Sequence, residues 1–289
     1  MSTVQFPELP LVGLNELTTL DRWTLERRAR ALARPLYLGD GVALGVILGR
    51  YKFYVDTRDI GFGAHVLLDG CWEPWLTVFM AQRIKPGMAV IDVGANHGYY
   101  TMLFADLVGP EGKVAAVECN PGLCQLLRRS ITVNGFDGRV QLLEQAAMDK
   151  EGSVIIHIDP AEPKNGRVLA AHEGAVNGAI TVRGGALAQD LKAWKKVDFI
   201  KMDVEGSEES ALAGLWPMIE RDRPQMLLEF NVHRCTDGAG LLSRLRKLYG
   251  EIRVVDFDAE TRAVKDAALL DTRSREDWML YLSTGKDGK

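Results

Sequence analysis

The sequence predicts an α/β fold: a mostly parallel seven-stranded sheet with helices on both faces, preceded by an N-terminal cap of helices and a hairpin. From about residue 87 onward, short apolar runs alternate with segments of helical periodicity. Gly and Pro residues separate the two kinds of segment. Strands that alternate with helices form βαβ units, whose strands run parallel. A chain of 289 residues is long enough to bury one full core around such a sheet.

Residues 1–86 are expected to form the cap, rather than a separately folding domain. Residues 14–36 have the periodicity of one or two Arg-rich amphipathic helices. Residues 51–56 alternate like a strand, and residues 61–70 indicate a turn followed by a second short strand. The apolar positions around Trp75 suit a helix that packs on the sheet. A Lys-Pro-Gly break then precedes the first core strand.

Residues 87–289 are expected to form the sheet domain. After the third strand the alternation is interrupted by a hairpin insertion at about residues 152–184, with strands at 153–158 and 179–183. This insertion is either a substrate lid or an edge hairpin that does not contact substrate. The last strand of the sheet should run antiparallel. The seven strands are expected at residues 90–93, 113–118, 140–147, around Lys201, and at 224–230, 252–256 and 278–282.

The segment after the first core strand, residues 94–98, is called the glycine loop below. The apolar run stops at Gly94, Gly98 follows with Asn96 between them, and helical spacing resumes at Tyr99. A tight turn from a strand into a helix surrounds a ligand with backbone N–H groups, as in nucleotide sites. The loop lacks the third glycine of a dinucleotide site, which disfavours an NAD-dependent oxidoreductase. A ligand without a pyrophosphate, such as S-adenosylmethionine (SAM), fits better.

A carboxylate stands at the end of the second strand. Glu118 follows the glycine loop by roughly 20 residues, the separation at which an acidic residue binds ribose hydroxyls. Its two oxygens can accept hydrogen bonds from two vicinal hydroxyls. The alternative is that Glu118 is a solvated strand-end residue. Asn120 then begins the next helix as its N-cap, with Pro121 at the first helical position.

Three motifs together resemble the FkbM-type SAM-dependent methyltransferases. They are Asp92-Val-Gly-Ala-Asn-His-Gly98, Glu118-Cys-Asn-Pro121 and Phe199-Ile-Lys-Met-Asp-Val-Glu-Gly-Ser-Glu208, and the likeness extends upstream to Gly70-Cys-Trp-Glu-Pro74. The resemblance covers roughly residues 51–231. It implies a Rossmann-like class I methyltransferase fold with SAM as cofactor. It also implies, usually, O-methylation of a hydroxyl on a small metabolite, sugar or natural-product scaffold.

The expected cofactor contacts come from these motifs and from the strand ends. Asp92 and the glycine loop should form the floor under the amino-acid part and the sugar of SAM. Asp203 should close the site near the methionine amine. The full set of expected contacts is Asp92, Gly94, Asn96 and Gly98 in the floor, Glu118 at the ribose hydroxyls, Asn120 beside the adenine, and Glu144, Gln145 and Ala146 along the adenine edge.

The catalytic residues are expected beyond the carboxyl ends of the strands, where open α/β sheets bind ligands. A hydroxyl is a poor nucleophile at neutral pH, so a positioned base helps. Asp203 and Glu205 follow the fourth strand. His97 and His233 follow the first and fifth strands and belong to the residue type that titrates near neutrality. The structural alternatives are that Asp203 only pairs with the central-strand Lys201, and that His97 only fills the loop.

Two further functions stay open from the sequence. Asp203, Glu229 and Asn231 match the strand ends at which catechol-type O-methyltransferases hold a divalent ion. Such oxygen ligands would suit Mg²⁺, which can lower the pKa of a bound hydroxyl. FkbM-type proteins are not generally metal-dependent, so the favoured site contains no metal and Mg²⁺ is the minority reading. The second alternative is a non-catalytic SAM-binding module that acts through a partner surface.

Composition narrows the choice of partners. A net charge of −4 and a pI near 5.8 argue against nucleic acid, because phosphate contacts need a basic surface. The apolar stretch at residues 41–49 is too short to span a membrane, and no signal peptide is evident. The four cysteines lack metal-like spacing and suit a reducing compartment. We expect a cytoplasmic enzyme with a small hydroxylated acceptor. The oligomeric state is open, and a homodimer is compatible with the sequence.

Overall fold

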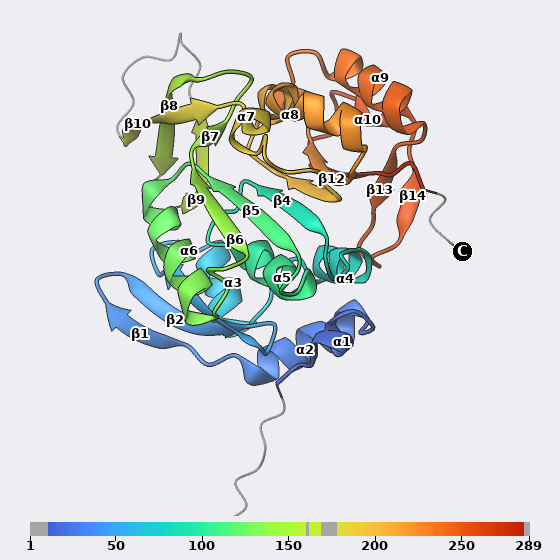
Figure 1. Ribbon diagram of the computed structural model, residues 1–289. Coiled ribbons are helices and arrows are strands. Elements are labelled where there is room, and N and C mark those ends of the chain that lie inside the picture. The colour runs from blue at the N-terminus through green and yellow to red at the C-terminus, as the bar shows by residue number, and fades with distance from the viewer. Residues whose placement is uncertain (1–10, 160–161, 169–177, 286–289) are drawn as a thin grey trace, which may run out of the picture.

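The computed structural model describes residues 11–159, 162–168 and 178–285, the segment 162–168 by its backbone alone. One eight-stranded sheet runs through the centre of the molecule (Figure 1). Its strands are β4 (Ala89–Val93), β5 (Lys113–Glu118), β6 (Val140–Glu144), β11 (Phe199–Met202), β12 (Gln225–Phe230), β13 (Arg253–Val255), β14 (Thr261–Ala263) and β15 (Trp278–Leu282).

The strand order is that of a Rossmann-like class I methyltransferase. Along the sheet the order is β14-β13-β15-β12-β11-β4-β5-β6. The strands β6, β5, β4, β11 and β12 are parallel, whereas β15 is antiparallel to both of its neighbours. The seven expected strands are therefore present, with the last one reversed as expected. The eighth strand, β14, is a three-residue edge strand whose Thr-Arg-Ala sequence has no apolar pattern to announce it.

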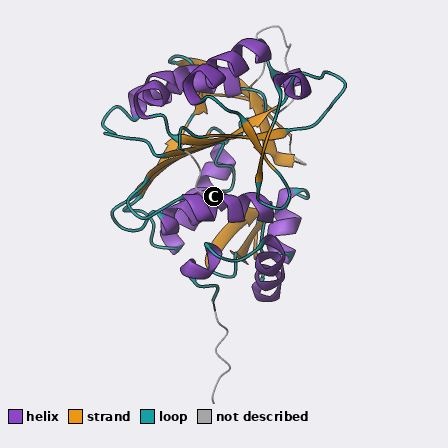
Figure 2. Ribbon diagram, turned by 90° about the vertical axis from the view of Figure 1, so that its right-hand side faces the viewer, coloured by secondary structure: helices purple, strands orange, loops and turns teal. Residues whose placement is uncertain are grey.

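Helices cover both faces of the sheet (Figures 1 and 2). The sequence of β4 is apolar on both faces, so Val90 contributes to one buried cluster while Ile91 and Val93 contribute to the other. Within the described ranges, no helix combines the length and apolar character needed to cross a membrane. One face carries α4 (Pro74–Arg83), α5 (Tyr99–Leu107) and α6 (Pro121–Val133), and the other carries α7 (Leu187–Asp190), α8 (Glu208–Asp222), α9 (Gly238–Tyr249) and α10 (Asp266–Leu269).

The N-terminal region lies outside the α4–α6 layer (Figure 1). Residues 61–70 do not form the expected strand. They form a helix in which Phe62 and Val66, four residues apart, are both buried, and the Asp59 carboxylate accepts a hydrogen bond from the Phe62 N–H at 2.9 Å. The other elements of this region are α1 (Leu14–Leu17), α2 (Arg22–Leu32), the antiparallel strands β1 (Leu36–Gly39), β2 (Val42–Ile47) and β3 (Tyr51–Asp56), and α3 (Phe62–Leu68).

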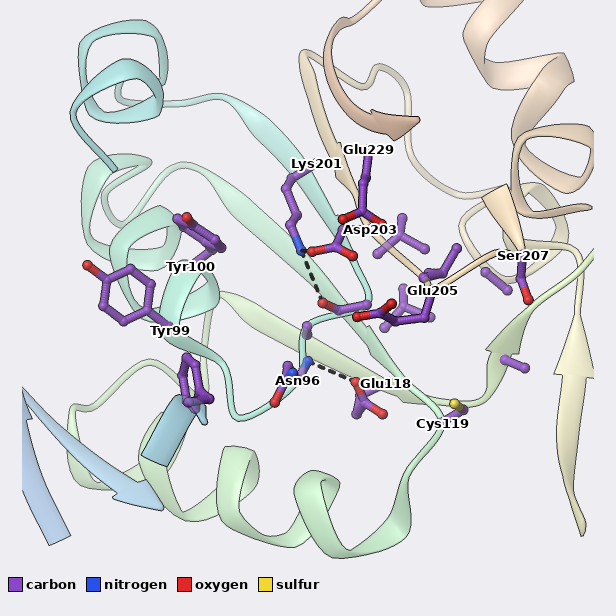
Figure 3. A pocket seen from close by; sticks show the side chains of 18 of the residues that line it. Asn96, Tyr99, Tyr100, Glu118, Cys119, Lys201, Asp203, Glu205, Ser207 and Glu229 are labelled. Atoms are coloured by element: carbon purple, nitrogen blue, oxygen red, sulfur yellow. Dashed lines mark hydrogen bonds and ion pairs between the residues drawn. The ribbon is translucent and has the colours of Figure 1, made fainter. Parts of the chain in front are cut away.

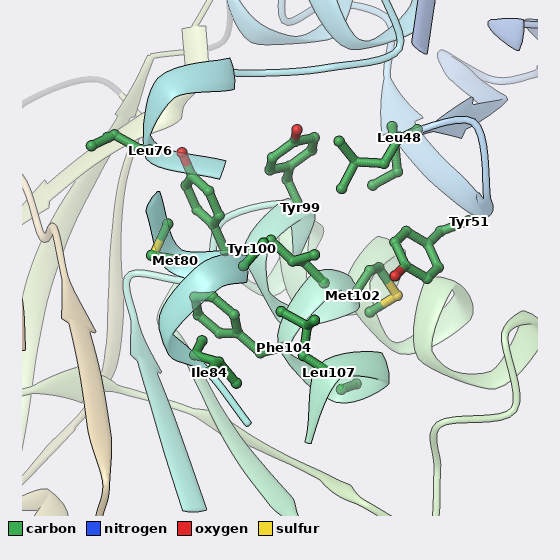
Figure 4. Close-up of a cluster of buried hydrophobic side chains, with 14 of the residues drawn as sticks. Leu48, Tyr51, Leu76, Met80, Ile84, Tyr99, Tyr100, Met102, Phe104 and Leu107 are labelled. Carbon is green, nitrogen blue, oxygen red and sulfur yellow. The ribbon is translucent and has the colours of Figure 1, made fainter. Parts of the chain in front are cut away.

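This region and the sheet domain share one apolar cluster (Figure 4). Leu48 and Tyr51 belong to the same buried cluster as Met102 and Phe104 of α5. Polar contacts reinforce the packing: the Tyr51 hydroxyl donates to the Asp106 carboxylate at 3.0 Å. Helix α4 falls within the expected cap range but covers the main sheet. The boundary at residue 86 therefore stays a prediction.

The insertion forms a small sheet of its own. Its strands β7 (Ala146–Ala147), β8 (Gly152–Asp159), β9 (Glu162–Val168) and β10 (Ala179–Gly185) lie in the order β7-β10-β8-β9. The expected strand at 140–147 is split, because the chain leaves the main sheet after Glu144 and pairs with β10 at Ala146 and Ala147. The two expected insertion strands form, and β9 adds a third. The middle of the insertion, residues 169–177 with His172, lies outside the described residues.

The glycine loop passes directly beneath the loop that follows β11. Gly94 has φ +76°, and a Cβ on it would lie 1.8 Å from the backbone oxygen of Asp203. The N–H groups of Gly94 and Ala95 both donate to the Val117 carbonyl, at 3.0 and 2.9 Å. The loop after β4 is thus packed backbone against backbone on the end of β5 and on the loop after β11. Glycine is required here both by the left-handed conformation and by the missing space.

We expect Gly94→Ala to lower the free energy of unfolding by about 3 kcal/mol or more, because backbone strain and a backbone clash add. Gly87→Ala is the matched control: Gly87 has φ +83° and nothing within 4 Å of its ideal Cβ. That variant should lose only about 1–2 kcal/mol, the cost of the left-handed conformation. Urea unfolding of both variants measures the difference. Equal losses would show that the close approach to Asp203 is unimportant.

Candidate active site

A cavity of about 310 Å³ opens where β4, β5, β11 and β12 reach their carboxyl ends (Figure 3). This is the edge at which open α/β sheets bind ligands, and the volume lies at the lower end of the range for small-molecule sites. Three kinds of residue line it: the glycine loop and the ends of β5 and β6, an acidic group after β11 and β12, and an aromatic wall. The three parts come from segments far apart in the sequence.

Glu118 is anchored at the cavity wall by the backbone. Its two carboxylate oxygens accept hydrogen bonds from the N–H groups of Asn96, at 2.8 Å, and Asn120, at 2.7 Å. Burial raises the pKa of Glu118, and these backbone bonds oppose the rise. A carboxylate oxygen can accept more than one hydrogen bond, so each retains capacity for a ligand hydroxyl. The side chain is thereby preorganised for a vicinal diol.

Gln145 lines the cavity and carries an unsatisfied acceptor. Its Nε2 donates to the Asp190 carboxylate at 2.7 Å, which fixes the orientation of the amide. Its Oε1 is buried and has no hydrogen-bond partner within the described part of the chain. An unpaired buried acceptor is costly, so it marks a place for a ligand donor. Ala146 lines the cavity next to it, whereas Glu144 is exposed, pairs with Arg128 and lies outside the lining.

Three expected cofactor residues support the cavity floor instead of lining it. Asp92 is fully buried, accepts a hydrogen bond from the Thr101 hydroxyl at 2.6 Å, and has its pKa raised to about 6 by burial. Gly98 precedes α5 with φ +95°, and Asn120 caps α6 through its side chain. These residues shape the loops that carry the lining residues Gly94, Asn96 and Glu118.

The acidic group surrounds one arginine. Nη1 of Arg234 lies 3.2 Å from a Glu205 oxygen and 2.8 Å from a Glu229 oxygen, and Nη2 lies 3.5 Å from Asp277. Glu205, Glu229 and Asp277 all line the cavity. Burial, and after it the negative charge of Asp203, raises the pKa of both Glu205 and Glu229, while Arg234 opposes the rise. The two glutamates thus contact the same guanidinium nitrogen.

Lys201 is buried in the centre of the sheet, and its expected ion pair with Asp203 forms at 3.2 Å. Its Nζ also donates to the Gly94 carbonyl at 3.3 Å. Burial alone would lower the pKa of Lys201, but the charges of Asp203 and Asp92 outweigh it and raise the pKa. Lys201 therefore carries its charge at the cavity wall.

Neither histidine proposed as a base lines the cavity. His97 is fully buried; its Nδ1 lies 2.7 Å from the Asn96 side-chain oxygen, and its Nε2 accepts from the Asp56 N–H at 3.3 Å. Its ring stacks on Phe62 with centroids 5.0 Å apart. His97 thus connects the N-terminal region to the glycine loop. His233 is held by its Nε2, 3.0 Å from the Ser274 carbonyl. The geometry favours the carboxylates over both histidines as bases.

The aromatic wall was missed from the sequence. Phe62 and Trp72 come from the N-terminal region, and Tyr99 and Tyr100 from the start of α5. Glu73, the residue between Trp72 and α4, accepts a hydrogen bond from the Tyr100 hydroxyl at 2.7 Å. The signal available in the sequence was the Trp-Glu-Pro motif at residues 72–74, which belongs to the family resemblance but carries no chemistry by itself.

Three residues of the cavity lining have a strained, left-handed backbone. Glu73, Asn96 and Glu205 all line the cavity, and all have positive φ, at +42°, +55° and +54°. Each left-handed non-glycine residue costs on the order of 1–3 kcal/mol and persists only where its surroundings enforce it. Such strain is typical of binding and catalytic sites, because it aims side chains that a relaxed loop would not hold.

The alternative metal set is not assembled. The side-chain oxygen of Asn231 accepts from the His233 N–H at 2.9 Å, and its amide donates to Asp277 at 2.8 Å. Glu229 is committed to Arg234, and Asn231 does not line the cavity. Across the described residues, no cluster of three or more His, Cys, Asp or Glu side chains could hold a metal ion. The Mg²⁺ alternative therefore lacks support in this geometry.

The fold and this cavity define a SAM-dependent methyltransferase. The chain belongs to the FkbM methyltransferase family, whose domain, described as Methyltransferase FkbM domain, matches residues 92–258. The chain is also similar to a solved structure, methyltransferase FkbM from Methylobacillus flagellatus KT, at 16% identity and a TM-score of 0.44 over 72% of this chain and 53% of that chain.

Similar sequences include isoaspartate methyltransferases and a quinone methyltransferase. Protein-L-isoaspartate O-methyltransferase 1 from Arabidopsis thaliana is 31% identical over 52% of this chain and 69% of its own length. Demethylmenaquinone methyltransferase from Symbiobacterium thermophilum is 34% identical over 29% of this chain and 34% of its own length. Protein-L-isoaspartate O-methyltransferase from Methanopyrus kandleri is 35% identical over 32% and 41%. The chain thus spans less than half of the last two relatives.

The residues present fit SAM. Glu118 can accept from the ribose hydroxyls, and the unpartnered oxygen of Gln145 can accept from the amino group of adenine. The glycine loop gives the backbone a close approach that no side chain at Gly94 would allow. The Lys201–Asp203 pair supplies both signs of charge for an amino-acid zwitterion.

We expect Glu118→Ala to weaken binding of S-adenosylhomocysteine about tenfold, the loss of roughly one charge-assisted contact worth about 1.4 kcal/mol. Calorimetric titration measures the affinity. Glu144→Ala is the matched control, because Glu144 is the neighbour of Glu118 on β6, is exposed and lies outside the cavity. Equal affinities for the two variants would remove Glu118 from the site.

We also expect methyl transfer to continue unchanged in EDTA, because Glu229 and Asn231 are engaged by Arg234, His233 and Asp277. The measurement is transfer of labelled methyl with and without chelator, followed by added Mg²⁺. A loss of activity that Mg²⁺ restores would revive the metal-dependent alternative.

Proposed function

We propose that the protein transfers the methyl group of SAM to a hydroxyl of a small organic acceptor. The observation that supports this most directly is the Glu205–Glu229 pair, which lines the cavity and shares the Arg234 Nη1 contact. When bound, SAM supplies an electrophilic methyl group on a sulfonium. The protein must then hold the acceptor oxygen in line and take up its proton.

Glu205 is the proposed proton acceptor. It follows the strand end, lines the cavity and is held in a left-handed conformation that aims it. Burial and the neighbouring charge of Asp203 raise its pKa, which makes it a stronger base than an ordinary glutamate. Glu229, deeper in the same pair, can share the proton, and Arg234 balances the charge of the deprotonated pair.

The aromatic wall is the proposed seat for the acceptor. Phe62, Trp72 and Tyr99 line the cavity and give it flat, largely apolar surfaces. An acceptor with an apolar ring face and hydroxyls on its edge would pack on these side chains and donate to the carboxylates. The N-terminal region supplies Phe62 and Trp72, so in this proposal it helps to choose the substrate.

The acidic wall disfavours a carboxylate as the acceptor. Isoaspartate methyltransferases are named among the similar proteins, and a carboxyl acceptor is a natural alternative. In this cavity such a group would face Glu205, Glu229 and Asp277, with Arg234 already shared among them. Like-charge contacts of this kind reject a ligand. A neutral hydroxyl meets no such penalty.

Glu205→Gln should lower kcat on the order of 100-fold, the typical contribution of a general base. In the wild type, the rate should fall as the pH falls through the raised pKa of Glu205, which lies above the ordinary glutamate value of 4.5, because the base must be deprotonated. In Glu205→Gln this dependence should weaken. Glu220→Gln, on the exposed face of α8, is the control. An unchanged pH profile in Glu205→Gln would exclude it as the base.

The acceptor class itself is tested with labelled SAM and three panels of small molecules matched in size: alcohols and sugars, amines, and carboxylic acids. Turnover in the hydroxyl panel supports the proposal. Transfer to amines or acids alone would overturn it. Tight SAM binding with no turnover in any panel would favour the non-catalytic SAM-binding module.

A further inference from the structure

Lys201 lies in a buried central strand, a position where lysine is unusual. It lies in β11, between β4 and β12 in the middle of the sheet, and its side chain is 5% exposed. A central strand of a parallel sheet is normally apolar on both faces. The neighbouring position on β4 is Asp92, also buried. A buried charge is costly unless its partners or a ligand compensate for it.

The described contacts of Lys201 leave part of its hydrogen-bonding capacity for a ligand. An ammonium group has three N–H donors. Two of them reach the Gly94 carbonyl at 3.3 Å and the Asp203 carboxylate at 3.2 Å. The Nζ also lies 5.5 Å from the centroid of the Tyr100 ring, and Tyr100 is itself part of the cavity wall. Lys201 itself lines the cavity, so the capacity for a third hydrogen bond is left for a ligand there.

No other described side chain of the cavity lining carries a positive charge like that of Lys201. Among the described side chains that line the cavity, Lys201 alone is a lysine, arginine or histidine. Away from Lys201, a ligand carboxylate would face the acidic side chains of the lining, which include Glu118, Asp203, Glu205 and Glu229. Lys201 and Asp203 instead place a positive and a negative group side by side next to the glycine loop (Figure 3). This is the charge pattern complementary to an α-amino acid zwitterion.

We infer that Lys201 binds the α-carboxylate of the amino-acid part of SAM, while Asp203 beside it binds the α-ammonium. Lys201 thus becomes a cofactor-binding residue as well as the brace between the glycine loop and the loop after β11. The inference concerns the cofactor alone, so it can be tested independently of the acceptor proposed above.

A purely structural role for Lys201 makes a different prediction. If Lys201 only holds Gly94 and Asp203 in place, removing it weakens every ligand of the site alike. If it also contacts the ligand carboxylate, its removal weakens ligands that carry that carboxylate more than ligands that lack it. Binding measurements with matched ligands separate the two roles without any turnover.

The experiment is calorimetric titration of two proteins with two ligands. The proteins are the wild type and Lys201→Met, and the ligands are S-adenosylhomocysteine and its decarboxylated analogue, which retains the amine. The wild type should bind the analogue about tenfold more weakly than S-adenosylhomocysteine, as expected for one lost charge-assisted contact. Lys201→Met should bind both ligands with similar affinity. Lys196→Met, an exposed lysine before the same strand, should behave as the wild type.

Two controls keep the result decisive. Methylthioadenosine lacks the whole amino-acid part, so its binding to Lys201→Met should match that to the wild type and report an intact adenosine site. If Lys201→Met does not fold, Lys201→Gln takes its place in the comparison. Equal binding of both ligands by the wild type would overturn the inference, irrespective of any variant. So would a variant that weakens both ligands equally, since that result assigns Lys201 a structural role.

Discussion

The close packing of the glycine loop beneath the loop after β11 is the constraint on which the site depends. It leaves no room for a Cβ at Gly94 and brings the Gly94 carbonyl within reach of the Lys201 Nζ. The same ammonium holds Asp203, so one buried charge joins two loops that come from adjacent strands. The position of the cavity floor relative to the acidic wall follows from this junction.

Several features of the site are unfavourable for the free energy of folding, and packing elsewhere in the protein offsets them. Glu73, Asn96 and Glu205 are held in left-handed conformations, Asp92 and Lys201 carry charge into the sheet, and Gln145 leaves an acceptor unsatisfied. Each of these features costs on the order of 1–3 kcal/mol, and all of them lie in or beside one cavity. The two apolar clusters on either face of the sheet provide the rigidity that keeps them in place.

The N-terminal region contributes to the site because it shares an apolar cluster with α5 and its side chains line part of the cavity. Phe62 stacks on His97, and the backbone of Asp56 donates to the same imidazole. His97, a candidate base from its sequence position, is therefore a buried connection between this region and the glycine loop. The cavity thus combines the carboxyl ends of the sheet strands with the side chains Phe62 and Trp72 of the N-terminal region.

The sequence by itself determined the parallel sheet, the glycine loop, the place of Glu118 and the acidic residues after β11, because these depend on local periodicity, turn chemistry and strand ends. The strand predicted within residues 61–70 was wrong, because the few apolar positions of such a short segment fit a strand or a helix equally well. Tertiary structure decided which carboxylates share Arg234, that Phe62 and Trp72 reach the cavity, and that both histidines lie outside its lining. Those outcomes depend on contacts between residues far apart in the chain, which spacing along the sequence does not encode.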